Sequence, residues 1–290
     1  MTQFRMPGTT IAKAGFGALF ALTALMTWAP AALAADCPKD LPVVEPGTLT
    51  MSINASIPPA QYIDKSGNLQ GLNVDLGNEI AKRLCLKPKY DNVAFEVQIP
   101  GLQTKRWDMI NTGLYYNEDR VKIMQLMPYA INALSLIVAN GNPLKVSKPE
   151  DLAGHAVGVE IGGVEEKELR QTDAEQVAKG AKPMDIRVFN TYGEAFLALG
   201  AGQIDAVFVG DATGKYYQEQ GKFTMAVTGL YPGSPSALAT INPVLAKAVA
   251  DALNSMLDDG AYKAMMDKGG MTKIDGWKDW TGHFKAYFKP

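Results

Sequence analysis

The sequence predicts an α/β protein built from two lobes, each with a mainly parallel sheet. Short β-like runs alternate with helical patterns along residues 48–139 and again along residues 144–230, which is typical of α/β domains. Two turn clusters interrupt the alternation, NGNP near 140–143 and YPGSPS near 231–236, and we expect the chain to cross between lobes there. A chain of 290 residues with 47% hydrophobic composition is large enough for two such lobes.

The N-terminal stretch has the pattern of a secretory signal peptide. It carries Arg5 and Lys13 but no acid, then an apolar run over 14–29, and a small-residue cleavage site that ends at Ala34. The alternative is a retained membrane anchor, which the run disfavours because a spanning helix needs about 20 residues. We therefore expect residues 1–34 to be removed and the mature protein to be exported.

The net charge of the mature chain bears on its partners, and its cysteine count bears on a disulfide. Removal of the two basic residues moves the formal charge from −2 to −4, and a mildly acidic chain argues against nucleic acid or an anionic membrane as partner. Cys37 and Cys85 remain. An even count in an exported chain suggests a disulfide between the mature N-terminus and the end of an early helix, the alternative being two unrelated thiols.

The first lobe is expected to contain residues 46–139 and 235–290. Its clearest element is a helix over 71–86, because apolar residues recur there every four positions and so share one face. These residues are Leu72, Leu76, Ile80 and Leu84. The other expected elements are strands over 48–54, 89–95, 107–113 and 133–140, a short helix over 98–105, a helix from Asn117 onward and a largely helical segment over 242–270.

The second lobe is expected to span residues 144–230. It opens with a β-like run that ends in a glycine pair, HAVGVEIGG, and continues with a strongly charged helical segment whose acids resemble a solvated face. The expected elements are strands over 155–163, 184–190 and 204–211, and helices over 165–180, 191–202 and 216–220.

Arg120 is the residue whose position most needs an explanation. Asn117 is a typical helix N-cap, and Glu118 and Asp119 fill the first turn as the helix dipole favours. A cation in the same turn opposes the dipole by several tenths of a kcal/mol, roughly the usual terminal effect. One explanation is a surface ion pair with a neighbouring acid. The other is an anion that binds there.

Several polar groups follow the expected strands and would face a cleft between the lobes. In NTGLYYNEDR, Thr112, Gly113, Tyr115 and Arg120 offer hydroxyl, carbonyl and guanidinium groups suited to a carboxylate. The glycine pair in VEIGGVEE exposes N–H groups at a helix start, which is a natural anion seat. In the segment VGDAT, Asp211 is available for a cation. Each signal alone is weak, and their joint position at strand ends strengthens them.

Catalytic and metal motifs are not recognisable. The histidines, His155 and His283, have no ligand partner at a useful spacing, and the sequence contains neither GxSxG nor a P-loop. We therefore expect no cofactor, no metal and no catalytic residue.

Four segments, in the same order, resemble the family 3 periplasmic solute-binding proteins, the amino-acid-type receptors of ABC importers. They are DKSGNLQGLNVDLGNEIAKRL, FEVQIPGLQTKRWDMINTGLYYNEDR, PEDLAGHAVGVEIGG and YGEAFLALGAGQIDAVFVGD. The resemblance implies a type II periplasmic-binding fold with two crossovers, a monomer in the periplasm, and a membrane permease as partner. It also implies a small carboxylated, amino-acid-like solute whose carboxylate is bound by Arg120. The other contacts that it implies are Asn54, Ile57, Phe95, Thr112, Gly113, Tyr115, Gly163, Val164 and the neighbourhood of Asp211.

Some of these positions depart from the pattern of the family. Asn54 stands where an aspartate is common, Ile57 where an aromatic is common, and Gly163 and Val164 replace a usual threonine pair. The usual ammonium-binding aspartate falls on Gly210, one residue before Asp211, and a one-residue slip in a strand turns a side chain to the other face. Recognition of an α-ammonium group is therefore open.

Two alternatives to the importer receptor remain. One is an enzyme on the same scaffold, similar to the cyclohexadienyl dehydratases, for which Glu160, Glu165 and Asp211 are the acids available in the cleft. The other is a sensor that presents its closed form to a membrane receptor.

Overall fold

The computed structural model describes residues 37–269 and 272–273. The chain divides into two compact units, residues 1–35 and 36–290, and the following concerns the second. The predicted signal peptide, 1–34, lies outside the described residues. Within the described part of the chain, no helix combines the length and the apolar character needed to cross a membrane.

A nine-stranded sheet forms the centre of the fold, in the order β5-β1-β6-β11-β7-β10-β8-β9, with β12 paired to β7. Strand β1 is parallel to β5 and β6, and β8 is parallel to β9 and β10. The α/β class with parallel pairing at both ends is thus confirmed. Its strands are β1 Thr48–Ile53, β5 Lys87–Asn92, β6 Met109–Tyr115, β7 Gln125–Ala139, β8 Ala156–Glu160, β9 Asp185–Phe189, β10 Ala206–Gly210, β11 Phe223–Thr240 and β12 Thr272–Lys273.

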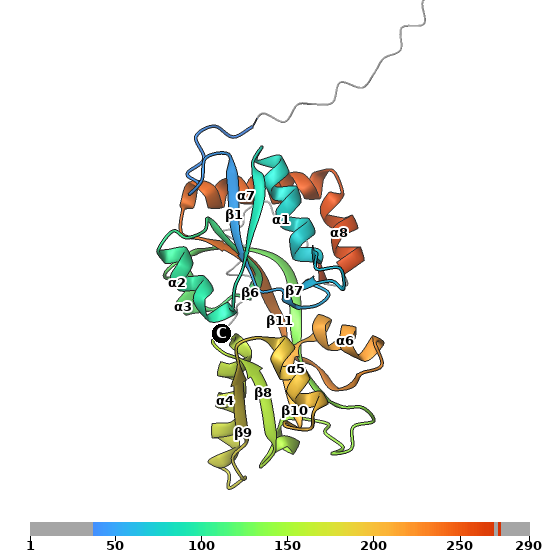
Figure 1. The fold of residues 1–290 in the computed structure, drawn as a ribbon. Helices are drawn as coiled ribbons and strands as arrows, with labels where there is room; N and C mark the ends of the chain where they lie inside the picture. The colour runs from blue at the N-terminus through green and yellow to red at the C-terminus, as the bar shows by residue number, and fades with distance from the viewer. Residues whose placement is uncertain (1–36, 270–271, 274–290) are drawn as a thin grey trace, which may run out of the picture. The chain divides into compact units, whose positions relative to one another are not determined.

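A small second sheet and two groups of helices complete the described structure. Figure 1 shows α1, α2, α7 and α8 around β1 and β6, and α4, α5 and α6 around β8 and β10. We call these groups the first half and the second half. The helices are α1 Leu72–Arg83, α2 Gln98–Gln103, α3 Glu118–Val121, α4 Val164–Val177, α5 Tyr192–Gly200, α6 Asp211–Glu219, α7 Pro243–Asp258 and α8 Ala261–Gly269, with 3₁₀ turns η1 Phe95–Val97 and η2 Pro149–Leu152. The small sheet is β2 Ser56–Ile57, β3 Gln61–Ile63 and β4 Leu69–Gln70.

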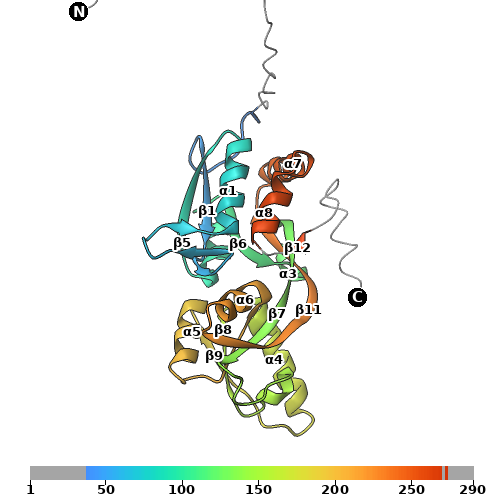
Figure 2. The ribbon, with the colours of Figure 1, turned by 90° about the vertical axis from the view of Figure 1, so that its right-hand side faces the viewer.

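The long antiparallel pair β7 and β11 connects the halves, as Figures 1 and 2 show. Strand β7 contacts β12 at Ile131 and β10 from Leu134 onward, so we place its passage between the halves at about 131–134. The expected crossing at 140–143 is instead the turn after β7. The sequence pattern placed the crossing too late, because only the apolar end of the fifteen-residue strand β7 could be recognised as a strand. Residues 231–236 lie within β11, where its register shifts.

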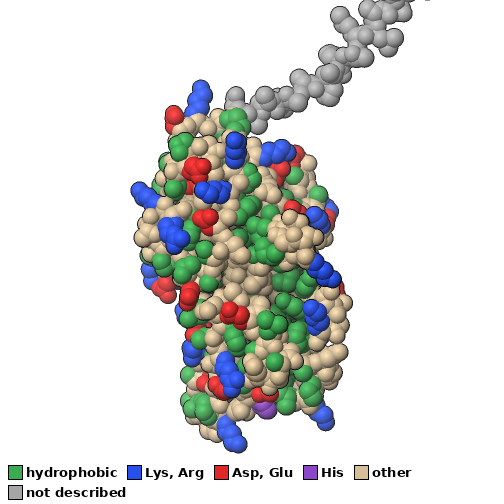
Figure 3. Space-filling model, in the orientation of Figure 1, with side chains coloured by type: hydrophobic (Ala, Val, Ile, Leu, Met, Phe, Trp, Pro, Cys, Tyr) green, Lys and Arg blue, Asp and Glu red, His purple; other side chains and the backbone are tan. Residues whose placement is uncertain are grey.

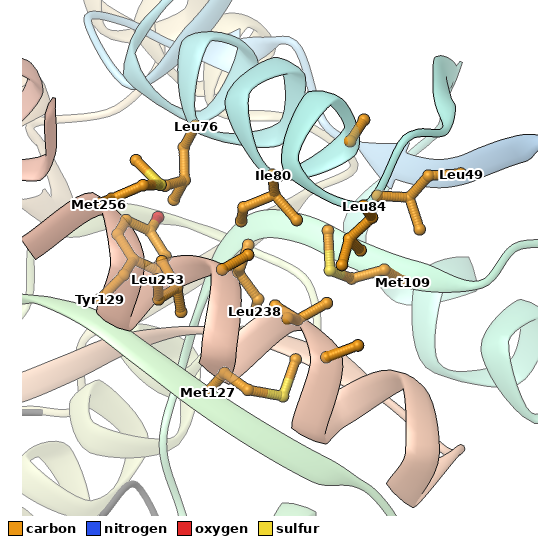
Figure 4. Close-up of a cluster of buried hydrophobic side chains, with 14 of the residues drawn as sticks. Leu49, Leu76, Ile80, Leu84, Met109, Met127, Tyr129, Leu238, Leu253 and Met256 are labelled. Carbon is orange, nitrogen blue, oxygen red and sulfur yellow. The ribbon is translucent and has the colours of Figure 1, made fainter. Parts of the chain in front are cut away.

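The hydrophobic core of the first half packs α1 against the sheet and α7. The four apolar residues expected on one face of α1 are all buried, as are Leu253 and Met256 of α7 opposite them. Figure 4 shows Leu76, Ile80 and Leu84 pointing into this cluster. On the face seen in Figure 3, basic and acidic side chains are interspersed.

The predicted disulfide between Cys37 and Cys85 is present and so confirmed, with a Cα–Cα distance of 5.6 Å. Cys85 follows directly after Leu84, the C-cap of α1, and adopts a positive φ of 57°. The bond fastens the start of the described chain to the end of α1 across a sequence separation of 48 residues.

Candidate functional site

A cavity of about 50 Å³ lies between the two halves and is lined by residues from both. The first half contributes the loop around Ile57, the end of β6 and Arg120. The second half contributes the end of β8 and the first residues of α4, α5 and α6. Strand ends and helix starts thus meet at one place, as expected for α/β units that face each other.

Eight of the ten residues that the resemblance implied as solute contacts line this cavity, and Asn54 and Asp211 do not. The eight are Ile57, Phe95, Thr112, Gly113, Tyr115, Arg120, Gly163 and Val164. Residues as distant in sequence as Ile57 and Val164 meet here because of the order of the strands in the sheet.

Arg120 lies at the cavity wall and is buried, with 7% of the residue exposed. The predicted cap is present, since Asn117 Oδ1 accepts a hydrogen bond from the Arg120 backbone N–H at 2.8 Å. Helix α3 has only four residues, so its dipole is weak. The unfavourable effect of this dipole on the charge of Arg120, which the sequence analysis expected, is therefore small. The position of Arg120 is set by the cap and by burial.

The guanidinium group is held by carbonyl oxygens. It donates to Tyr115 O at 2.6 Å and to Gly162 O at 3.3 Å, and it lies 5.3 Å from the centroid of the Phe95 ring. No ion pair of Arg120 is present among the described residues; Asp119 pairs with Lys122 instead. Burial lowers the pKa of Arg120 to about 10, which Glu165 opposes, so the group remains a cation at neutral pH.

The Tyr115 hydroxyl accepts a hydrogen bond from Asn132 Nδ2 at 3.0 Å, and both groups border Gly210. A Cβ at Gly210 would lie 2.8 Å from Asn132 Nδ2 and 2.9 Å from the Tyr115 hydroxyl oxygen. Two neutral polar groups therefore lie against Gly210, the position to which the resemblance assigned an ammonium-binding aspartate.

We expect Gly210→Ala to lower the free energy of unfolding by about 1–3 kcal/mol, because overpacking forces Asn132 and Tyr115 apart. Thermal unfolding of the variant measures the effect. Gly200→Ala is the matched control, since a Cβ there meets the Phe223 ring at an ordinary 3.7 Å. Equal melting temperatures for the two variants would contradict this description of the Gly210 surroundings.

Asp211 does not face the cavity, contrary to the sequence expectation. Its carboxylate accepts hydrogen bonds from the Ser135 hydroxyl and from the backbone N–H of Gly229. The physical reason is that Asp211 is the first residue of α6 rather than the last residue of a strand, so its side chain points toward β7 and β11.

Asn54 lies behind the cavity wall and supports it. Its backbone N–H donates to Thr112 Oγ1 at 3.1 Å, and its side-chain Nδ2 donates to Glu160 Oε1 at 2.6 Å. Since Asn54 follows β1 and Glu160 ends β8, the second bond joins the two halves directly. The lining residue at this place is thus Glu160, which the sequence analysis considered only for the enzyme alternative.

Glu160 is a buried carboxyl group inside the cavity, 3% exposed. Burial and the nearby Glu165 raise its pKa to about 8, although Asn54 and the backbone N–H of Tyr192 favour the charged form. The surroundings of Glu160 therefore favour its neutral form more than water does.

The sequence analysis did not single out Tyr192, and it considered Glu165 only for the enzyme alternative. Glu165 stands in the first turn of α4, where it was interpreted as part of a solvated face, yet it is 6% exposed and burial raises its pKa. The Tyr192 hydroxyl is buried beside it without a well-aligned hydrogen bond. The available signal was Gly163: a Cβ there would lie 2.8 Å from Glu165 Oε2, so glycine leaves room for that carboxyl.

These groups give the cavity one guanidinium group, two carboxyl groups, hydroxyls from tyrosine and threonine, and the edge of a phenylalanine ring. A guanidinium group and helix-start N–H groups suit a carboxylate, and buried carboxyl groups suit a cation. The arrangement is suited to a small solute that carries charges of both signs.

The chain is similar to known proteins in sequence. The profile of the bacterial extracellular solute-binding proteins, family 3, matches residues 49–270. The chain is 28% identical over 230 residues to the L-cystine-binding protein TcyJ of Escherichia coli (strain K12), covering 78% of this chain and 84% of that protein.

Two solved structures are also similar. An ancestral arginine-binding protein bound to arginine has a TM-score of 0.71 at 29% identity, covering 77% of this chain and 98% of that one. The ancestral amino acid-binding protein AncCDT-1, a precursor of cyclohexadienyl dehydratase, has a TM-score of 0.68 at 26% identity, covering 77% of this chain and 95% of that one. All residues that line the cavity lie within the range matched by the family profile.

Proposed function

Because this chain belongs to the bacterial extracellular solute-binding proteins, family 3, we propose that it is a periplasmic receptor that delivers a small carboxylated, amino-acid-like solute to an ABC transporter permease. One observation carries the choice of solute. Arg120 is buried, cationic at neutral pH and free of any ion pair among the described residues, and it faces the cavity between the halves.

A carboxylate would bind at Arg120 and at the start of α4. Its two oxygens match the planar fork of a guanidinium group, and the backbone N–H groups near Val164 point outward from the N-terminus of a fourteen-residue helix. Burial strengthens such contacts, because the effective dielectric constant falls from about 80 in water to about 20 near protein groups.

The two halves would act as lobes that open and close over the solute. Their ranges are those expected from the sequence, except that β7 passes from lobe 1 to lobe 2 at about 131–134, so that residues 135–139 belong to lobe 2. A cavity of about 50 Å³ is smaller than the ~150 Å³ that accommodates benzene in an apolar core, so a solute enters only when the halves separate. The bond between Asn54 and Glu160 and the bond from Arg120 to Gly162 O join the halves in the structure described here.

Relatives support an amino-acid-like solute. One is named for L-cystine, and one similar structure holds arginine, so the known ligands share a carboxylate but differ in side chain. We propose that the protein works as a monomer, that its signal peptide is cleaved after Ala34, and that it lacks catalytic activity.

A thermal-shift screen tests the proposal. The probes are amino acids, opines, organic acids and quaternary amines, added to the mature protein. At a concentration of 100 Kd, a specific solute stabilises by about 2.7 kcal/mol, which raises Tm by about 5–10 °C for a protein of this size. The proposal fails if no carboxylated compound raises Tm.

A second candidate function has one observation in its favour. Glu160 lines the cavity and its pKa is raised, which favours the protonated form that a general acid needs, and AncCDT-1 is a precursor of cyclohexadienyl dehydratase. Turnover of prephenate or arogenate by the purified protein would establish the enzyme. Neighbouring permease and ATPase genes would distinguish an importer receptor from a sensor.

A further inference from the structure

Two hydroxyl groups of β6, those of Thr112 and Tyr115, lie on the wall of the cavity. Both residues are more than nine-tenths buried, with 4% and 8% exposed. A hydroxyl group has one hydrogen to donate and also accepts hydrogen bonds, so its partners in the protein decide what it offers to a solute. Here those partners include side-chain amides, and the orientation of each amide follows from the backbone groups around it.

The Thr112 hydroxyl oxygen accepts two hydrogen bonds. The backbone N–H of Asn54 can only donate, and it does so to Thr112 Oγ1 at 3.1 Å. Gln61 Nε2 lies 3.1 Å from the same oxygen and 2.9 Å from the Thr112 carbonyl oxygen, which can only accept, so the nitrogen of this amide must face Thr112. In agreement, Gln61 Oε1 accepts from Asn73 Nδ2 at 2.6 Å. Both lone pairs of Thr112 Oγ1 are therefore occupied, and its own hydrogen is left for a solute.

The Tyr115 hydroxyl is oriented in the same way. The backbone N–H of Ala133 donates to Asn132 Oδ1 at 3.1 Å, so Asn132 turns its nitrogen toward Tyr115 and donates to the phenol oxygen at 3.0 Å. Burial and then the charge of Glu165 raise the pKa of Tyr115, so the phenol keeps its proton. Among the described residues, neither this hydroxyl nor that of Thr112 has an acceptor for its hydrogen. Toward a solute, both hydroxyls are donors.

The Tyr115 hydroxyl lies at the place to which the resemblance assigns the α-ammonium group of a solute. Its oxygen is 2.9 Å from where a Cβ at Gly210 would be, the position expected to carry the ammonium-binding aspartate. Asp211, the next residue, is turned away toward Ser135 and Gly229. An ammonium group has only hydrogens to offer, so it cannot accept from a hydroxyl donor. The hydroxyl of Tyr115 therefore needs an acceptor atom on the solute rather than a cation.

The second half of the molecule presents carboxyl groups to the same cavity. Glu160 and Glu165 both line it, and burial raises the pKa of each, which favours the neutral forms that attract no cation. Glu165 already interacts with its own backbone N–H, with the Tyr192 hydroxyl and with the charge of Arg120. A hydroxyl group of the solute suits both sides of the cavity, because it accepts from Tyr115 and donates to a carboxyl oxygen.

We propose that the solute carries an oxygen atom, as a hydroxyl or an oxo group, on the carbon next to its carboxylate, and that Tyr115 selects this oxygen. The solute class is therefore the 2-hydroxy and 2-oxo carboxylic acids, which have the shape of amino acids and differ from them in that one group. Thr112 offers a second donor to a further oxygen of the solute. This inference rests on the proposed function, because it assumes that the carboxylate binds at Arg120.

Calorimetric titration of the mature protein with matched pairs of compounds tests this inference. The pairs are L-lactate and L-alanine, L-glycerate and L-serine, L-malate and L-aspartate, and L-2-hydroxyglutarate and L-glutamate. Any other amino acid that raises Tm in the screen is paired with its own 2-hydroxy counterpart. The members of a pair differ only at the carbon next to the carboxylate, so the contributions of shape and of Arg120 are shared. In each pair that binds, we expect the hydroxy acid to bind at least about tenfold more tightly than the amino acid.

Tyr115→Phe removes the donor and keeps the ring. The variant should lose about tenfold in affinity for the hydroxy acid, because an oxygen of the solute is left without its partner, and should keep its affinity for the amino acid. A change in this ratio is not expected from loss of structure alone, which weakens both compounds. Tyr116→Phe is the matched control, since the hydroxyl of Tyr116 bonds Glu118 and does not line the cavity, and it should behave as the parent.

The possible failures are distinguishable. If the amino acid binds as tightly as its hydroxy counterpart, or more tightly, the inference is refuted while the role of a receptor for a carboxylated solute stands. The same holds if the compounds that bind all lack an oxygen on the carbon next to the carboxylate. A Tyr115→Phe variant with the same preference as the parent would also refute the inference. If no carboxylated compound binds at all, the proposed function itself is wrong.

Discussion

Arg120→Ala is expected to weaken solute binding by about 2–5 kcal/mol, which corresponds to at least about thirtyfold in Kd. The reason is that the guanidinium group is buried against carbonyl oxygens and a phenylalanine ring, with no acid paired to it among the described residues. A solute carboxylate would lose its charged partner in a place that water cannot readily fill. Titration of parent and variant with the solute found by the screen measures the loss.

Two further variants make this result specific. Arg120→Lys keeps the charge but loses the planar fork, so it should recover only part of the affinity. Arg187→Ala removes an exposed arginine of β9 that bonds Asp185 and the Gln203 carbonyl, and it should bind as the parent does. Equal affinities for Arg120→Ala and the parent would remove Arg120 from the proposed site.

The second large effect concerns the disulfide. Replacement of both Cys37 and Cys85 by serine is expected to lower the free energy of unfolding by about 4 kcal/mol, the chain-entropy value for a closed loop of this length. Tm should fall by about 8–16 °C. Neither cysteine lines the cavity, so solute affinity should stay the same.

Reduction provides the control for this prediction. A reductant should lower the Tm of the parent toward that of the double variant and leave the double variant unchanged. A parent that melts at the same temperature with and without reductant would show that the bond between Cys37 and Cys85 contributes nothing to stability.

The sequence predicted best the features that depend on local patterns. The helix α1 follows from four apolar residues at regular spacing, and the Asn117 cap from the residue types that surround it. The role of Arg120 was predicted by the family resemblance, because the argument from the helix dipole carries little weight for a helix of four residues. The family-like segments predicted eight of the lining residues, because the resemblance assigns each of them by its position within those segments.

Features that depend on distant packing could not be predicted in this way. Glu165 is indistinguishable in sequence from Glu166, which is only partly buried, and the approach of Arg120 and Tyr192 from other elements buries Glu165. Asp211 was misplaced because a strand and a helix meet there without any residue between them. The extent of β7 was missed because only its later part forms a continuous apolar run, whereas Gln125, Pro128 and Asn132 interrupt its earlier part.

The ladder between β7 and β11 has a mechanical consequence. Two adjacent strands that share hydrogen bonds resist sliding past each other, whereas a paired ribbon bends easily across its flat face. The shifts of register on either side of Leu230 interrupt the hydrogen bonding between β7 and β11 and so weaken the pairing near that residue. Opening is therefore expected to be a hinge rotation about these two strands near Leu230. A mutation at this level of the ribbon would change the rate of solute release more than the specificity for the solute.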